Sequence, residues 1–213
     1  MRLAKSDRVI FFEGKDRKIL KKISKKLGRF DFLHDSRTHF LQAGGFEQWR
    51  RVKEVDWALD NVFGLNVKVA ALFDKDYRSE NCVRSFVERT KTERLWIEVF
   101  DRKEIENYAL SKRGLTRFLI SVSSEAPNPM DEAAAESFLW ELTVGFKMLV
   151  EANVISSYVQ YEKSIRKGVE ESTLYGEVRL LFDAQWERLE GRFSLISGKE
   201  FISVLSAKTQ TQY

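Results

Sequence analysis

Two aspartates directly follow one of the most apolar stretches of the chain. The segment Val67–Phe73 is almost entirely apolar, and Asp74 and Asp76 come next, one residue apart. Side chains of an extended strand alternate between its two faces, so both carboxylates point the same way if the strand geometry continues through Lys75. Because like charges repel, this arrangement predicts either a bound cation or intervening water between the two side chains.

Other acidic residues also follow apolar runs that are typical of strands. In a parallel sheet the carboxyl ends of all strands lie on one edge, where ligands bind. Up to six carboxylates can meet there: Glu13, Asp16, Asp74, Asp76, Glu104 and Glu106. Taken singly, each is more often a turn, cap or solvated residue, but their common position at strand ends favours a site. Without His or Cys, such oxygen ligands suit Mg²⁺ or Mn²⁺ and not zinc.

Strands and helices alternate through the first half of the chain. Apolar runs stopped by Gly or Asp predict strands, and apolar residues three and four apart predict helices. The expected strands are Arg8–Gly14, Thr38–Gly45, Val67–Asp74 and Arg94–Phe100. The expected helices are Asp16–Gly28, Phe46–Phe63, Ser79–Thr90 and one that begins within Asp101–Leu110. This order predicts an α/β, Rossmann-like parallel sheet flanked by helices, and the third strand is apolar enough for burial on both faces.

The pattern changes at Ser123–Met130, which contains both prolines of the chain. Only helical periodicity follows as far as residue 190, which predicts an inserted or appended helical lobe. Residues 192–208 then predict an extended piece, a Ser-Gly-Lys turn and a short helix. The expected organisation is a catalytic core over residues 1–112, a helical lobe over 113–190 and a C-terminal segment over 191–213 that returns to the active site.

Charge and cysteine content limit the possible binding partners and the cellular compartment. The 213-residue chain has a net charge of +4, but residues 1–30 hold eleven Lys and Arg against three acidic residues. The first helix could therefore follow a DNA backbone without reading bases, or could simply be a solvated face; the residues concerned are Lys18, Lys21, Lys22 and Lys25. The single Cys82 excludes an intrachain disulfide and indicates a reducing, cytoplasmic compartment. No apolar run is long enough for a membrane span, so no membrane partner is expected.

Three segments together resemble a known catalytic domain. "VIFFEGKDRKIL", "ALFDKDYR" and "DRKEIENYAL" are similar to the Toprim domain, the metal-binding domain of topoisomerases, primases and certain nucleases. The later "SGKE" resembles, within that group, the OLD (overcoming lysogenization defect) family nucleases. The resemblance covers about residues 8–110 and returns at 192–208. It implies a Toprim-like sheet and a metal-dependent DNA endonuclease, the catalytic region of an ATPase-nuclease.

The resemblance also implies roles for individual positions. Glu13 matches a metal ligand or general acid/base, Asp16 a ligand of a second metal, and Asp74 with Asp76 the metal-binding pair. Either Glu104 or Glu106 matches a further acid of the nuclease branch. Lys199 matches a residue that contacts phosphate in the transition state. Two Mg²⁺ or Mn²⁺ ions about 4 Å apart would flank the scissile phosphate.

Alternatives remain beside the nuclease interpretation. The chain contains no GxxxxGK[ST] motif, so no ATP site is expected in it. It is expected to be either a catalytic-region fragment that lacks the ATPase domain of the resembling family or a natural stand-alone Toprim protein. The same scaffold could be a non-catalytic docking or regulatory module, or a nucleotidyl transferase of primase type. DNA is the expected partner, and a homo-oligomer is possible.

Overall fold

The computed structural model describes residues 7–14, 16–29 and 37–212, and these form two compact units. The first unit takes the chain up to Lys75 together with Glu80–Phe100, and the second takes Asp76–Ser79 and the chain from Asp101 onward. The chain thus enters the second unit briefly after the third strand and returns. The predicted core boundary at residue 112 falls inside the second unit, and the C-terminal segment belongs to that same unit.

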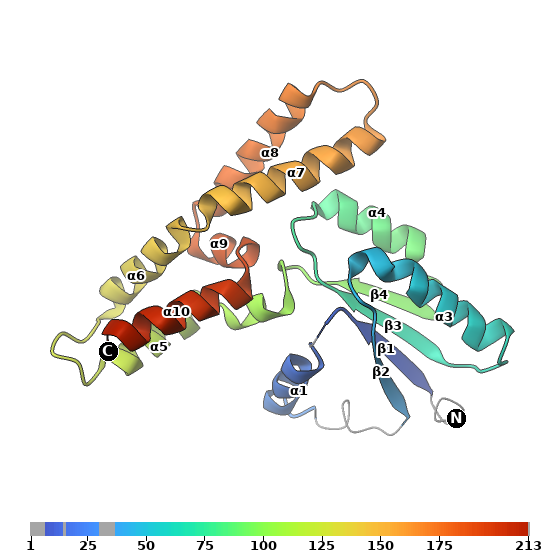
Figure 1. Cartoon of the computed structure of the whole chain (residues 1–213), viewed down its shortest axis with the longest axis horizontal. Helices are drawn as coiled ribbons and strands as arrows, with labels where there is room; N and C mark the ends of the chain where they lie inside the picture. Colours follow the sequence, from blue (N-terminus) through green and yellow to red (C-terminus); the bar gives the residue numbers. More distant parts are fainter. Residues whose placement is uncertain (1–6, 15, 30–36, 213) are drawn as a thin grey trace. The chain divides into compact units, whose positions relative to one another are not determined.

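The first unit is a parallel sheet with helices on both faces (Figure 1). In its described residues four strands pair in the order β2-β1-β3-β4, namely β1 (Arg8–Phe12), β2 (Thr38–Gln42), β3 (Lys68–Phe73) and β4 (Leu95–Val99). The helices are α1 (Arg17–Lys26), α3 (Trp49–Asn61) and α4 (Glu80–Thr90), with a 3₁₀ turn η2 (Phe46–Gln48) before α3. Helix α1 lies on one side of the sheet, and α3 and α4 lie on the other. The α/β fold and all four predicted strands are confirmed.

The strand order creates a switch point between β1 and β3. The chain passes from β1 outward to β2, and then crosses back past β1 to β3 and on to β4. Strands β1 and β3 are hydrogen-bonded neighbours, with Phe12 opposite Leu72. Their connections leave the sheet in opposite directions, so the backbone diverges at their carboxyl ends. In open parallel sheets ligands bind at such a divergence.

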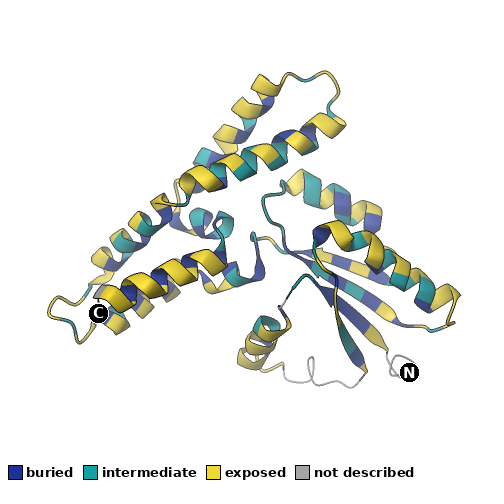
Figure 2. Ribbon diagram, viewed as in Figure 1, coloured by how far each residue is buried: buried dark blue, intermediate teal, exposed yellow. Residues whose placement is uncertain are grey.

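The core of the first unit lies on the side of α3 and α4. Burial alternates along β4, where Leu95 and Ile97 are buried while Trp96 between them is 63% exposed. Figure 2 shows this mixture of buried and exposed residues along the strands. The prediction that the third strand is buried on both faces is therefore too strong, because Ala70 and Leu72 are only partly covered by the described residues.

The second unit is helical in its described residues. It contains a 3₁₀ turn η3 (Ile105–Ala109), then α5 (Lys112–Ser123), α6 (Glu132–Val144), α7 (Lys147–Ile165), α8 (Glu171–Trp186), α9 (Leu189–Leu195) and α10 (Gly198–Gln212). The two prolines lie between α5 and α6, as predicted. Helices α7 and α8 run side by side as a hairpin (Figure 1). No helix in the described part of the chain combines the length and apolarity that a membrane crossing requires.

Two local predictions for this unit are wrong. The helix expected within Asp101–Leu110 is only the short turn η3. The extended piece expected from Arg192 is instead the end of helix α9. Phe193 is fully buried there, with its ring 5.4 Å from that of Phe201, and the Arg192 guanidinium lies 3.8 Å from the Trp140 ring centre. These tertiary contacts stabilise a helix whose local sequence does not indicate one.

Candidate functional site

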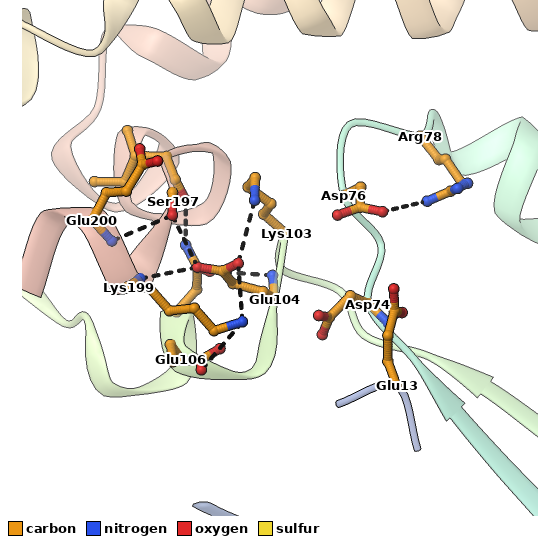
Figure 3. A network of polar contacts seen from close by, with 12 residues as sticks. Glu13, Asp74, Asp76, Arg78, Lys103, Glu104, Glu106, Ser197, Lys199 and Glu200 are labelled. Carbon is orange, nitrogen blue, oxygen red and sulfur yellow. Dashed lines mark hydrogen bonds and ion pairs between the residues drawn. The ribbon is translucent and has the colours of Figure 1, made fainter. Parts of the chain in front are cut away.

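Glu13 and Asp74 lie together at the switch point of the sheet. Glu13 follows β1 and Asp74 directly follows β3, so the strand pairing brings both to the same edge. The backbone N–H of Asp74 donates to Glu13 Oε2 at 3.1 Å, and Figure 3 shows the two side chains next to each other. Asp74 is only 7% exposed. The predicted convergence of acids from the first and third strands is therefore confirmed for this pair.

Asp16 adds a third carboxylate to the turn after β1. It occupies the position before α1, but its side chain does not cap that helix. Its Oδ2 instead accepts a hydrogen bond from the backbone N–H of Gly14 at 3.1 Å, and the residue is buried. The carboxylate therefore turns back toward the end of β1. Asp16 is therefore not a simple helix cap, because its side chain accepts no hydrogen bond from the first turn of α1.

Gly45 lets the backbone after β2 pass close to Glu13. A Cβ atom at this position would lie 3.4 Å from Glu13 Oε1, and φ is +109°, a conformation that side-chain-bearing residues rarely adopt. The sequence marked the glycine pair Gly44–Gly45 only as the end of a strand. Gly45 also allows the backbone to pass close to the Glu13 carboxylate. A glycine near the end of a strand often marks such a close approach, so the sequence contained a signal for it.

Asp76 does not continue the geometry of β3. The strand ends at Phe73, and Asp76 has φ +50°, in the left-handed region. Its N–H donates to the Lys103 carbonyl at 2.8 Å, and its carboxylate pairs with the Arg78 guanidinium at 2.7 Å. The prediction that strand alternation aligns Asp76 with Asp74 is wrong, since a turn and not a strand joins them. Asp76 belongs to the second unit and has a cation partner there.

Glu104 caps the first turn of α10. Its Oε1 accepts from the Lys199 backbone N–H at 3.0 Å and from Ser197 Oγ at 3.3 Å (Figure 3). Its Oε2 lies 3.3 Å from Lys103 Nζ and 3.7 Å from Lys199 Nζ. Burial raises the pKa of this carboxyl, but the Lys199 N–H and the two ammonium groups together hold the pKa below its ordinary value. Both oxygens of this predicted metal ligand thus have protein partners.

Glu106 and Lys199 form the adjoining ion pair. The Nζ of Lys199 lies 3.4 Å from Glu106 Oε1, and the Lys199 side chain is 58% exposed. Glu106 Oε2 is buried and has no hydrogen-bond partner within the described residues. Sequence reasoning left open which of the two glutamates is a ligand. Which of the two glutamates binds a metal stays a prediction, since the unpartnered Oε2 of Glu106 is buried.

The basic residues of α1 are exposed as a nucleic-acid contact requires. Ser24 is its one buried residue, and Leu27, which directly follows the helix, is 70% exposed. The four lysines predicted to contact DNA all lie on the exposed surface: Lys18, Lys21, Lys22 and Lys25. Binding to DNA through this helix stays a prediction.

The acids do not form a complete metal site by themselves. Across residues 7–14, 16–29 and 37–212, no three His, Cys, Asp or Glu side chains are grouped so that they could hold a metal ion. Comparison with protein-family models, curated proteins and solved structures gives no match to this chain. The resemblance to the Toprim domain therefore remains a prediction that depends on the motifs and on the acids at the sheet edge.

Proposed function

We propose that this chain is a divalent-metal-dependent nuclease that hydrolyses phosphodiester bonds in DNA. The single observation that supports it most is the hydrogen bond between Glu13 and the backbone of Asp74. That bond runs from the Asp74 backbone N–H to the Glu13 carboxylate, and so holds together the ends of two neighbouring parallel strands at the switch point, where such sheets bind their ligands. The proposal also depends on the resemblance to OLD-family Toprim nucleases.

The donor set at this edge fits Mg²⁺ or Mn²⁺. Glu13, Asp16 and Asp74 offer carboxylate oxygens only, and two of the three are buried. Hard cations of this kind bind one or two carboxylates and keep several waters, so a full cage of protein ligands is not required. Asp76 and Glu104 belong to the second unit, where their carboxylates pair with Arg78 and with the first turn of α10.

The residues of the chain would act by orientation and by charge. A bound ion would supply an activated water and would withdraw charge from the phosphate. The Asp74 N–H fixes the direction of the Glu13 carboxylate, which leaves little reorganisation for the reaction itself. We assign to Lys199 the neutralisation of charge that grows on the phosphate in the transition state. Its exposed ammonium group is compatible with that role.

Plasmid cleavage tests this proposal. Supercoiled DNA incubated with the protein and Mg²⁺ or Mn²⁺ is expected to become nicked and linear, and EDTA is expected to stop the reaction. The rival function, a non-catalytic docking module, is favoured by the absence of a grouped acid trio in the described residues. It predicts no cleavage with either metal. Cleavage that persists in EDTA would contradict a metal-dependent mechanism.

Helix α1 is expected to supply affinity that does not depend on base sequence. Changing Lys21, Lys22 and Lys25 to alanine should weaken binding to all DNA sequences equally. Each lost phosphate contact should flatten the slope of log affinity against log salt by about 1. Fluorescence anisotropy at several salt concentrations measures both effects.

A matched triple variant controls for the loss of net charge. The three control lysines are also exposed but lie apart in the second unit: Lys147 on α7, Lys167 in the turn between α7 and α8, and Lys208 on α10. Their change to alanine should leave the slope nearly unchanged. If both triple variants flatten the slope alike, α1 has no special role and the effect is that of overall charge.

A further inference from the structure

One buried side chain ties two turns of the second unit together. Asn107 is fully buried in η3, and its amide donates to the Phe193 carbonyl at 2.6 Å and to the Ile196 carbonyl at 2.9 Å. Its Oδ1 accepts from the Glu104 backbone N–H at 3.1 Å. These bonds join η3 to the end of α9, immediately before α10 begins. Asn107 therefore fixes the position at which α10 starts.

Glu104 also holds the start of α10 in place. The Glu104 carboxylate accepts from the Lys199 backbone N–H, so the first turn of the helix is anchored at this residue. A Cβ atom at Gly198 would lie only 3.0 Å from the Asn107 nitrogen and from the Glu106 Cβ. The motif "SGKE" thus contains a glycine, Gly198, at the point where η3 and the start of α10 are in contact. Lys199, which carries the ammonium group, follows that glycine directly.

We infer that Asn107 and Glu104 are positioning residues that fix the place and direction of the Lys199 ammonium group. Neither residue needs to touch metal or DNA for this role. The inference rests on the proposed nuclease function only where it concerns the reaction rate. The position of the Lys199 amine can be measured without any nuclease activity, so failure of one proposal does not decide the other.

The first test replaces Glu104 by glutamine and measures the reactivity of Lys199. Glutamine keeps the shape and can still accept from the Lys199 N–H, but it no longer pairs with the two ammonium groups. Reductive methylation followed by peptide mass spectrometry gives the modification rate of each lysine. Lys208, exposed in the same helix, is the internal reference. We expect Lys199 to react about 2–5-fold faster relative to Lys208, which corresponds to the loss of an ion pair.

The same variant separates positioning from metal binding. Glu104→Gln should lower the single-turnover cleavage rate by about 10-fold or more, while DNA affinity and the metal concentration for half-maximal rate stay within about 2-fold. A raised metal requirement with unchanged Lys199 reactivity would overturn the inference and make Glu104 a metal ligand. If the variant has a lower melting temperature but unchanged Lys199 reactivity and an unchanged cleavage rate, Glu104 is only a structural cap of α10.

Asn107→Ala and Gly198→Ala test the other two contacts. Both should raise the reactivity of Lys199 relative to Lys208, because α10 can no longer start where it does. If Asn107→Ala does not fold, Gly198→Ala decides the matter, since it removes no buried hydrogen-bonding group. Ser111→Ala is the control: it removes the cap of α5, where Ser111 Oγ accepts from the Gly114 N–H at 3.1 Å, and so weakens a different helix from α10. Equal Lys199 reactivity in the control and in Gly198→Ala would contradict the inference.

Discussion

Changing Asp74 to asparagine is expected to lower metal-dependent DNA cleavage by at least about 10²-fold while the protein stays folded. Asparagine has the same shape, but it removes the negative charge that we propose as part of the metal site. The hydrogen bond to Glu13 comes from the Asp74 backbone, so the substitution does not remove it. Single-turnover cleavage with Mn²⁺ and thermal unfolding without metal measure the two halves of this prediction.

Glu88→Gln is a suitable control for the lost charge. Glu88 is exposed on α4, in the same unit, and is not one of the acids at the strand ends. Its substitution should leave both the cleavage rate and the melting temperature nearly unchanged. If Asp74→Asn cleaves within about 2-fold of the parent rate, Asp74 has no part in the reaction. If it unfolds more than about 6 °C earlier without metal, its role is structural.

Changing Gly191 to alanine is expected to be the most destabilising glycine substitution in the helical unit. A Cβ atom there would lie 1.9 Å from the carbonyl oxygen of Gln185, so α9 cannot keep its place against the end of α8. Such overpacking against backbone should cost about 3 kcal/mol or more. The melting temperature should fall by roughly 6–12 °C, measured by circular dichroism.

Gly176→Ala in α8 is the opposite case and provides the control. This glycine lies inside a helix, and an added Cβ would meet nothing within 4 Å. Alanine should stabilise the helix by about 0.5–1 kcal/mol because it restricts the unfolded chain and favours helix. A pair of variants with equal melting temperatures would show that the close contact at Gly191 does not exist in solution.

The sheet and its acids could be predicted because their signals are local. Apolar runs that end in acidic residues mark both β1 and β3, and the parallel order of the strands follows from the intervening helices. The convergence of Glu13 and Asp74 then requires only that the two strands are neighbours.

The remaining features depend on partners that are distant in the sequence. Asp76 takes a left-handed conformation in a turn that bonds to Lys103, which no rule of strand alternation anticipates. Glu104 caps a helix that begins 94 residues later, at Gly198. Asn107 was not singled out, although its spacing from Glu104 is that of a capping box, with Glu104 at the cap and Asn107 three residues on. That local signal could have identified the turn, but not its bonds to Phe193 and Ile196.

Titration of the protein with Mn²⁺ tests the central claim most directly, because it measures metal binding without any need for cleavage. Electron paramagnetic resonance of free Mn²⁺ should show at least one ion bound per wild-type chain. Glu13→Gln and Asp74→Asn should each weaken that binding by at least about 10-fold, a loss of about 1.4 kcal/mol, whereas Glu88→Gln should bind as the parent does. Absence of binding by the wild type, or equal binding by all four proteins, would contradict a metal site at the carboxyl ends of β1 and β3.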